Sequence, residues 1–243
     1  MTVSRPEGAG PFPAVVIMHD CSGLGPASSG APGRWAKELV RRGYVVVLPD
    51  SFTPRGVPDG VCTAVPPRGT DVGHVRRARD AYAALAHVRT LPYVDGRRVG
   101  LMGGSHGGST TLVSLATDME SATAEGRTGF AAAVALYPRC SIVPRSYRPV
   151  APLLILIGGS DDWTPAEDCQ TLADTAQKAG APLAIKIYPG AHHSFDSDRP
   201  VRFVATRINP SSPSGRGATT GGHREAWADS IREVVAFFGQ HLR

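Results

Sequence analysis

The first indication of the fold is the segment Leu101-Met102-Gly103-Gly104-Ser105-His106-Gly107-Gly108, which sets a serine between a predicted strand and a predicted helix. The apolar run Val99 to Met102 predicts the strand, and Ser109 to Ala116 predicts the helix. Small neighbours let the backbone turn sharply at Ser105 without Cβ clashes. The pattern Gly-x-Ser-x-Gly is weak evidence alone, since a glycine-rich turn before a helix produces it by chance. Its place between strand and helix strengthens it.

On both sides of this segment, short apolar runs recur along the chain and predict further strands. They lie at Ala14 to Met18, Tyr44 to Leu48, Ala131 to Tyr137, Leu153 to Ile157 and Leu183 to Tyr188. Runs that are apolar without alternation suit strands buried on both faces, as in a parallel sheet. The sequence therefore predicts a mostly parallel sheet.

Helical stretches separate these runs. They are Arg34 to Arg42, Asp71 to Leu91, Ala166 to Ala179 and Arg224 to Leu242. In Asp71 to Leu91, the three- and four-residue spacing predicts one apolar face, made of Val75, Ala78, Tyr82, Leu85 and Val88. The alternation of strand and helix predicts a single doubly wound α/β domain over residues 1–243, with helices flanking the sheet.

Two segments interrupt the alternation. Ser51 to Thr70 is rich in Pro and Gly and is expected to be a loop over the strand ends. Asn209 to Gly222 is rich in Ser, Gly and Thr and is expected to be a mobile loop before the last helix. Whether this second loop covers a pocket is left open by the sequence.

Composition and charge exclude several classes of protein. The 243 residues are 42% hydrophobic with a net charge of +5, which fits a folded chain with a full core. The basic residues are scattered, so nucleic acid is not an expected partner. No apolar run reaches the roughly 18 residues of a membrane span, and no signal peptide is recognisable. A cytoplasmic location is the default expectation, and secretion is expected only if a leader was removed. The oligomeric state is left open.

The four cysteines, Cys21, Cys62, Cys140 and Cys169, lie far apart without a Cys-x-x-Cys pair. A zinc site is not expected from this spacing. Export would favour two disulfides, whereas a reducing compartment would favour buried free thiols. The pairing stays open, and no metal is predicted.

A serine hydroxyl needs a base to take its proton and an acid to orient that base. In the α/β-hydrolase fold these follow the serine in the order acid, then histidine. Gly158 to Pro165 follows a predicted strand and offers Asp161 or Asp162 as the acid, and either aspartate could instead cap the next helix. Tyr188 to Phe195 follows the last predicted strand and offers His192 or His193.

The backbone N–H groups that would bind a developing oxyanion are also predicted. One belongs to His106, just after the serine, and the other to the loop His19 to Gly25, where Cys21 is the expected donor. His19 is expected to have a structural hydrogen-bonding role. The candidate pocket residues lie on loops near the strand ends, where open α/β sheets bind ligands. They are Leu24, Phe52, Tyr137 and Trp163.

The chain resembles the dienelactone hydrolase family of the α/β hydrolases over nearly its whole length. The resemblance lies in His19 to Gly23, Pro49 to Gly56, Gly103 to Gly108, Gly158 to Pro165, and Tyr188 to Phe195. In that family the acid lies four residues before a proline, which implies Asp161. The base lies two residues before a phenylalanine, which implies His193. Together with Ser105 these would form the catalytic set.

Three departures from the family pattern change the expected substrate. The dienelactone hydrolases proper have a cysteine where this chain has Ser105 and a glutamate where it has Asp20. Their substrate-binding arginine, four positions after the histidine, is replaced by Ser197. The resemblance therefore implies the serine branch, with carboxylesterase or lactonase activity on small-molecule or polymeric esters and no cofactor. A peptidase or amidase on the same residues, or a binding protein that retains the fold, are the alternatives.

Overall fold

The computed structural model describes residues 1–117 and 129–243 and contains a seven-stranded sheet in the order β1-β3-β2-β4-β5-β6-β7. Only β1 is antiparallel to its neighbour, and the other strands are parallel. The strands are β1 (Thr2–Ser4), β2 (Phe12–Met18), β3 (Val45–Leu48), β4 (Val94–Gly104), β5 (Ala132–Leu136), β6 (Leu153–Gly158) and β7 (Leu183–Tyr188). The predicted mostly parallel sheet is confirmed.

The central strands are buried along most of their length, as their unbroken apolar sequences require. Ala14 to Met18 and Ala132 to Leu136 are each almost fully buried. A strand with helices on both faces cannot alternate apolar and polar residues, because both faces lie in the core. β4 is longer than the predicted run and begins at Val94, where Asp95 and its neighbours lie outside the apolar core.

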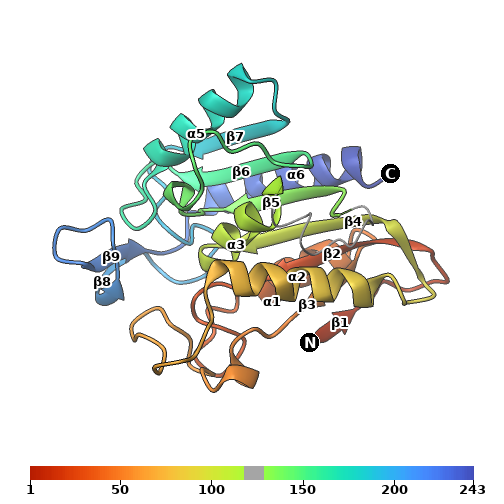
Figure 1. Ribbon diagram of the computed structural model, residues 1–243, viewed down its shortest axis with the longest axis horizontal. Helices are drawn as coiled ribbons and strands as arrows, with labels where there is room; N and C mark the ends of the chain where they lie inside the picture. The colour runs from red at the N-terminus through yellow and green to blue at the C-terminus, as the bar shows by residue number, and fades with distance from the viewer. Residues whose placement is uncertain (118–128) are drawn as a thin grey trace.

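In the part of the chain that the structure describes, five helices cover the two faces of this sheet. They are α1 (Ala31–Val40), α2 (His74–Val88), α3 (His106–Ser114), α5 (Ala166–Lys178) and α6 (Arg224–His241). Figure 1 shows α2, α3 and α5 on the near face, with α1 and α6 behind the sheet. Trp35 of α1 packs edge-on against Trp227 of α6, with ring centroids 4.7 Å apart. The predicted flanking helices are confirmed, whereas the single domain over residues 1–243 stays a prediction.

One residue of the predicted apolar face of α2 is placed wrongly by the periodicity. Ala78, Tyr82, Leu85 and Val88 are buried, but Val75 is 53% exposed. Val75 lies in the first turn of α2. The buried face begins instead at Arg77.

The expectation of a mobile loop over Asn209 to Gly222 is wrong. The segment contains β9 (Arg216–Thr220), which pairs antiparallel with β8 (Arg202–Ile208). Asn209 is buried, and its side-chain amide donates to the carbonyls of Asp162 and Gly217 at 3.0 and 2.7 Å. These bonds tie the hairpin to the loop after β6, which a composition rich in Ser, Gly and Thr does not reveal.

The loops relevant to function lie at one edge of the sheet. Because the strands from β3 to β7 are parallel, their carboxyl ends meet there, and Figure 1 shows the β8–β9 hairpin beyond this edge. Ser51 to Thr70 lies there as expected and holds only a short 3₁₀ turn, Thr53–Arg55.

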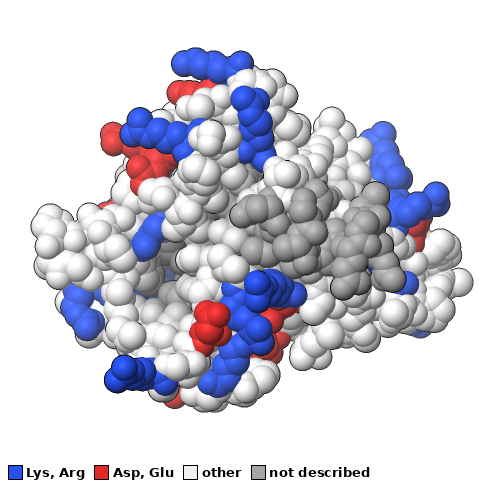
Figure 2. Space-filling model, viewed as in Figure 1, with Lys and Arg blue, Asp and Glu red and all other residues white. Residues whose placement is uncertain are grey.

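Charged side chains are spread over the face of the molecule shown in Figure 2. Figure 2 shows Lys and Arg scattered over one face, with Asp and Glu among them. None of the helices in residues 1–117 and 129–243 is long and apolar enough to span a bilayer.

Candidate active site

The turn from β4 into α3 holds Ser105 in a strained conformation. Its φ of 54° and ψ of −117° lie where L-residues are rarely found, at a cost of about 1–3 kcal/mol. The glycines of the motif are needed for space. A Cβ at Gly107 would lie 2.0 Å from the Met18 carbonyl oxygen, and one at Gly103 would lie 2.3 Å from that of Gly107. The turn therefore presents Ser105 at the carboxyl edge of the central strand.

Loops after β6 and β7 bring an aspartate and a histidine to this serine. The Ser105 Oγ lies 2.8 Å from His193 Nε2, and His193 Nδ1 lies 2.8 Å from Asp161 Oδ2. A carboxylate only accepts hydrogen bonds, so Nδ1 carries the proton and Nε2 is left to accept from the serine hydroxyl. All three residues are buried. The arrangement can draw a proton from Ser105.

The Asp161 carboxylate is fixed by its own loop. Its Oδ1 accepts from the backbone N–H groups of Trp163 and Thr164 at 3.0 and 2.9 Å, and the Thr164 hydroxyl lies 2.9 Å from Oδ2. Aromatic rings confine His193, with the Tyr137 and Trp163 centroids 4.8 and 4.7 Å from the imidazole. The Asp161 carboxylate and the His193 imidazole are therefore held in place by their neighbours.

The two alternative residues have other roles. The Asp162 carboxylate accepts from the backbone N–H and the hydroxyl of Thr219, at 2.8 and 2.7 Å, and so fastens β9. The idea that it caps the following helix is wrong, since α5 has no side-chain cap. His192 Nδ1 lies 2.8 Å from the Ser160 carbonyl. Neither residue contacts Ser105 or His193 through a hydrogen bond.

The two predicted oxyanion donors lie at the same cavity as Ser105. Cys21 follows β2, His106 opens α3, and both line this cavity together with the serine. Within residues 1–117 and 129–243, neither backbone N–H has a hydrogen-bond acceptor. His106 also stands at a helix N-terminus, where the free N–H groups favour negative charge. Two residues whose backbone N–H groups are unpaired thus line the cavity that holds the serine.

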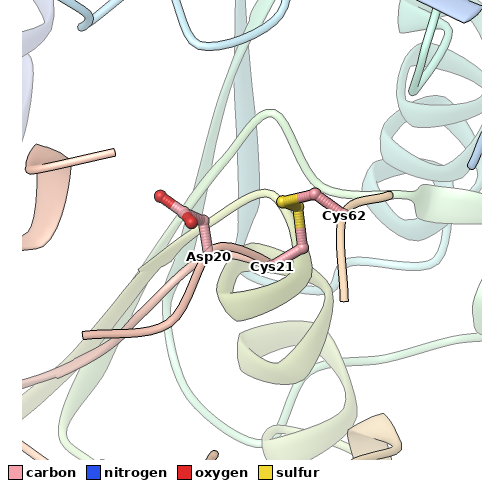
Figure 3. A group of neighbouring side chains, drawn as sticks. All are labelled: Asp20, Cys21 and Cys62. Atoms are coloured by element: carbon pink, nitrogen blue, oxygen red, sulfur yellow. A yellow bond between two sulfur atoms is a disulfide. The ribbon is translucent and has the colours of Figure 1, made fainter. Parts of the chain in front are cut away.

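Cys21 is covalently joined to the loop between β3 and α2. It forms a disulfide with Cys62, and Cys140 pairs with Cys169, so no cysteine is free. Asp20, Cys21 and Cys62 bring a carboxylate and two sulfurs within 4.8 Å. Figure 3 shows the Asp20 carboxylate directed away from the disulfide. Disulfide sulfurs are not thiolates, and Asp20 accepts from Ser22 and Ser29, so this group does not suit a metal.

The cavity beside Ser105 measures about 240 Å³. Beyond the residues already named, its walls come mainly from Val61, His74, Arg139, Trp163, Ile208 and Pro210. Of the four predicted pocket residues, Trp163 lines this cavity, whereas Leu24, Phe52 and Tyr137 do not. Phe52 packs against His19 and Val57 in a separate cluster, and the Tyr137 hydroxyl donates to buried Asp196 at 2.8 Å.

Sequence reasoning missed Arg77, a fully buried cation beneath the site. Its guanidinium donates to the His19 carbonyl and contacts His106 Nδ1, both at 2.6 Å, and it lies 4.8 Å from the Phe52 ring centre. Burial lowers the pKa of Arg77 to about 9. A signal was present, because Arg77 shares a helix face with Ala81 and Val88 at four- and seven-residue steps.

The histidines around Arg77 are held neutral by their burial and by the positive charge of Arg77. Burial first, and Arg77 second, lower the pKa of His74 to about 4 and that of His19 to about 3, and hold that of His106 well below its usual range. His19 is structural as expected: its Nδ1 lies 2.8 Å from the Asp20 carbonyl, and its Nε2 accepts from the Ser51 N–H.

Comparisons with known proteins bear on the family and the fold of this chain. The sequence profile of the dienelactone hydrolase family matches residues 1–242. A relative from Synechocystis, provisionally named carboxymethylenebutenolidase, is 25% identical over 214 residues, 84% of this chain and 83% of the relative. A relative from Escherichia coli K12 with the same provisional name is 26% identical over 211 residues, 80% of this chain and 72% of the relative.

Solved structures share the fold at lower identity. A protein of Klebsiella pneumoniae, provisionally described as a dienelactone hydrolase, superposes with a TM-score of 0.68 at 21% identity, over 98% of this chain and 91% of that one. A thermophilic esterase of Thermogutta terrifontis with bound propionate also gives 0.68, at 18% identity over 98% and 88% of the two chains. By its sequence over almost its full length, this chain belongs to the dienelactone hydrolase family.

Proposed function

We propose that this chain is a serine hydrolase that cleaves carboxylic esters through an acyl-enzyme, with Ser105 as nucleophile, His193 as base and Asp161 as the orienting acid. Family membership supports ester or lactone hydrolysis in general. The observation that carries the finer proposal is the continuous chain of 2.8 Å contacts from Ser105 through His193 to Asp161. The strained φ of Ser105 supports it further, since such strain is concentrated at functional sites.

The first half of the reaction forms the acyl-enzyme. The Ser105 Oγ attacks the ester carbonyl carbon while His193 Nε2 takes the hydroxyl proton. The N–H groups of Cys21 and His106 bind the resulting oxyanion, and each such donor typically contributes about 3 kcal/mol to transition-state stabilisation. His193 then gives its proton to the departing alkoxide, and the alcohol leaves.

The second half releases the acid. Water attacks the acyl carbon as His193 takes one of its protons, and the second tetrahedral intermediate collapses by breaking the bond to Ser105 Oγ, which recovers its proton from His193. Asp161 stays ionised and keeps the imidazole in the tautomer with its proton on Nδ1. The cavity of about 240 Å³ beside the serine suits short or medium acyl chains.

The proposal is tested by hydrolysis of p-nitrophenyl acetate, butyrate and octanoate. The Ser105→Ala variant should lose at least about 10³-fold in kcat/KM on every ester, because the nucleophile is gone. Ser114→Ala is the matched control. Ser114 lies on α3, and its hydroxyl donates to the Thr110 carbonyl of the same helix, so this variant should keep wild-type rates. Equal rates in the wild type and the Ser105 variant would contradict the proposal.

A covalent probe gives independent evidence. The Thermogutta terrifontis esterase has been solved in a form phosphorylated by paraoxon. We expect paraoxon to inactivate this chain and to leave one diethylphosphoryl group on the peptide that contains Ser105, as read by mass spectrometry. A label on another residue would argue against Ser105 as the nucleophile. Turnover of anilides faster than of esters would favour the amidase alternative.

A further inference from the structure

A second cavity of about 240 Å³ lies beside the candidate active site and is distinct from it. It is enclosed by the loop after His193, the β8–β9 hairpin, and the segments around Ser22 and Asp59. None of Ser105, His193 and Asp161 lines it. Cys62 lines both cavities, so the disulfide to Cys21 stands between them. We call this second space the arginine cavity, after Arg199, Arg202 and Arg207 in its wall.

The three arginines of this cavity lack anionic partners. Within residues 1–117 and 129–243, none of their guanidinium groups makes an ion pair or a hydrogen bond. Arg207 is the most enclosed, and its Nε is buried without a partner. Burial, only partly offset by Asp20, and the nearby charges of Arg202 and Arg199 lower the pKa of Arg207. A buried donor without an acceptor destabilises the empty site.

The acidic groups nearby do not neutralise this charge. Asp59 lies at the cavity wall and is exposed. Asp20 is buried, its oxygens accept hydrogen bonds from Ser22 and Ser29, and its charge acts on Arg77 as well as on Arg207. With three arginines and one aspartate in its lining, the cavity keeps a surplus of two positive charges.

We infer that the arginine cavity binds a phosphate group, either as free inorganic phosphate or as the phosphomonoester group of an organic molecule. A phosphate carries nearly two negative charges at neutral pH, which matches the surplus, and its oxygens accept several hydrogen bonds. Guanidinium groups bind such oxygens in pairs. The hydroxyls of Ser194, Ser197 and Thr220 line the same wall and supply further donors.

The position of the site connects it to the loop of the proposed base. Ser194 directly follows His193, and the Gly221 N–H donates to the His193 carbonyl at 3.1 Å. The Arg207 guanidinium lies 5.2 Å from the centre of the Trp163 ring, which also packs against His193. Binding does not depend on Ser105, so the inference stands or falls separately from the proposed function.

Isothermal titration calorimetry on the full chain tests the inference, with inorganic phosphate, phenyl phosphate and succinate at constant ionic strength. We expect saturable binding of one phosphate group per chain. Inorganic phosphate alone would identify a free anion, and phenyl phosphate alone would identify an esterified one. Ser105→Ala should bind as the wild type does, which separates this site from the proposed esterase chemistry.

Variants on one hairpin provide the matched comparison. Arg207→Gln should weaken phosphate binding at least tenfold. Arg216→Gln should change it less than twofold, because Arg216 is exposed, bonds to the Thr206 carbonyl, and does not line the cavity. If Arg207→Gln does not fold, as judged by its melting curve, the exposed Arg202→Gln replaces it with the same expectation.

Three results would overturn the inference. The first is the lack of saturable binding by either phosphate compound. The second is succinate binding as tightly as phosphate, which would make this a carboxylate site. The third is equal loss in the Arg207 (or Arg202) and Arg216 variants, which would indicate unspecific attraction to a basic hairpin.

Discussion

The two disulfides join regions that are built in different ways. Cys140 and Cys169 link a short 3₁₀ turn (Cys140–Ile142) to α5, and both sit in the main hydrophobic core. Cys21 and Cys62 link two segments without regular structure above the carboxyl ends of the strands. The first bridge lies within a scaffold already fixed by packing. The second lies in the layer of loops that surrounds Ser105.

The loop layer depends on a few specific contacts. The Val61 N–H donates to the Cys21 carbonyl at 2.7 Å, and the Ile208 N–H donates to the Cys62 carbonyl at 2.9 Å. Cys62 therefore joins the candidate oxyanion loop to the β8–β9 hairpin. The scaffold can lose one contact and keep its geometry. The loop layer has few other contacts that could replace a lost one. Function should be sensitive to single changes in the loop layer, and stability to changes in the scaffold.

The largest effect is expected at the neighbouring aspartates of the loop layer. Asp161→Asn should lower kcat by about 10⁴-fold with little change in melting temperature, because the amide no longer holds the correct imidazole tautomer. Asp162→Asn should keep kcat within about tenfold, because Asp162 only fastens Thr219. Hydrolysis of p-nitrophenyl butyrate and thermal melts measure both. A larger loss in the Asp162 variant would make that residue the acid.

The two disulfides can be removed in parallel. Their cysteines are 41 and 29 residues apart, so chain entropy predicts similar stability losses, about 3.9 kcal/mol for Cys21–Cys62 and about 3.6 kcal/mol for Cys140–Cys169. Only Cys21→Ser/Cys62→Ser should also lower kcat, by about tenfold or more, since the Cys21 N–H is a proposed oxyanion donor. KM should change less than kcat.

Urea unfolding and ester kinetics of both double variants, at a temperature where each is folded, decide this comparison. Cys140→Ser/Cys169→Ser is the control for lost stability alone. An equal fall of kcat in the two variants would mean that the bridge near Ser105 acts on overall stability and does not position the loop.

The next effect concerns acid stability. Folding lowers the pKa of His74 to about 4, so the unfolded chain binds a proton that the folded chain excludes between about pH 6.5 and pH 4. The stabilisation is complete above pH 6.5 and is lost as the pH falls toward 4, at up to about 1.4 kcal/mol per pH unit. His74→Gln should flatten this loss in urea titrations between pH 7.5 and 4.5.

Other titratable groups also contribute to the pH dependence of the unfolding free energy. His19 titrates in the same direction, with a folded pKa of about 3, so the variant should keep part of the acid sensitivity. Buried Asp196 has a raised pKa and acts in the opposite direction, because its stabilisation is lost as the pH rises. Both are unchanged by the substitution. Identical pH profiles for wild type and variant would mean that His74 is not protected from protonation.

The division between scaffold and loop layer also explains which features could be predicted from the sequence. Apolar runs such as Leu153 to Ile157 identify buried parallel strands, because an apolar run without alternation reflects burial on both faces. The Gly-x-Ser-x-Gly turn can be recognised because close backbone contacts require its glycines. The choice of Asp161 and His193 over their neighbours came from the family pattern, and the structure places these two in contact with Ser105 or its partner.

The features that could not be predicted from the sequence depend on contacts between distant segments. The β8–β9 hairpin is held by Asp162 and Asn209, and its Ser- and Gly-rich second half looks like a mobile loop when read alone. The disulfide pairing depends on which loops meet above the sheet. Phe52 and Tyr137 lie at or just after the ends of predicted strands, yet their side chains are buried and do not line the cavity beside Ser105.

The smallest expected effect tests the one residue of α2 that the periodicity misplaced. Val75→Ala should change the free energy of unfolding by less than about 0.5 kcal/mol, since the Val75 side chain is 53% exposed and loses little packing. Leu85→Ala, on the buried face of the same helix, should cost about 2–5 kcal/mol because it leaves a cavity. Urea unfolding measures both. If Val75→Ala lowered the free energy of unfolding by more than 1 kcal/mol, the apolar face would extend into the first turn of the helix, as the spacing alone predicts. The scaffold would then reach further toward the loop layer than the exposure of Val75 indicates.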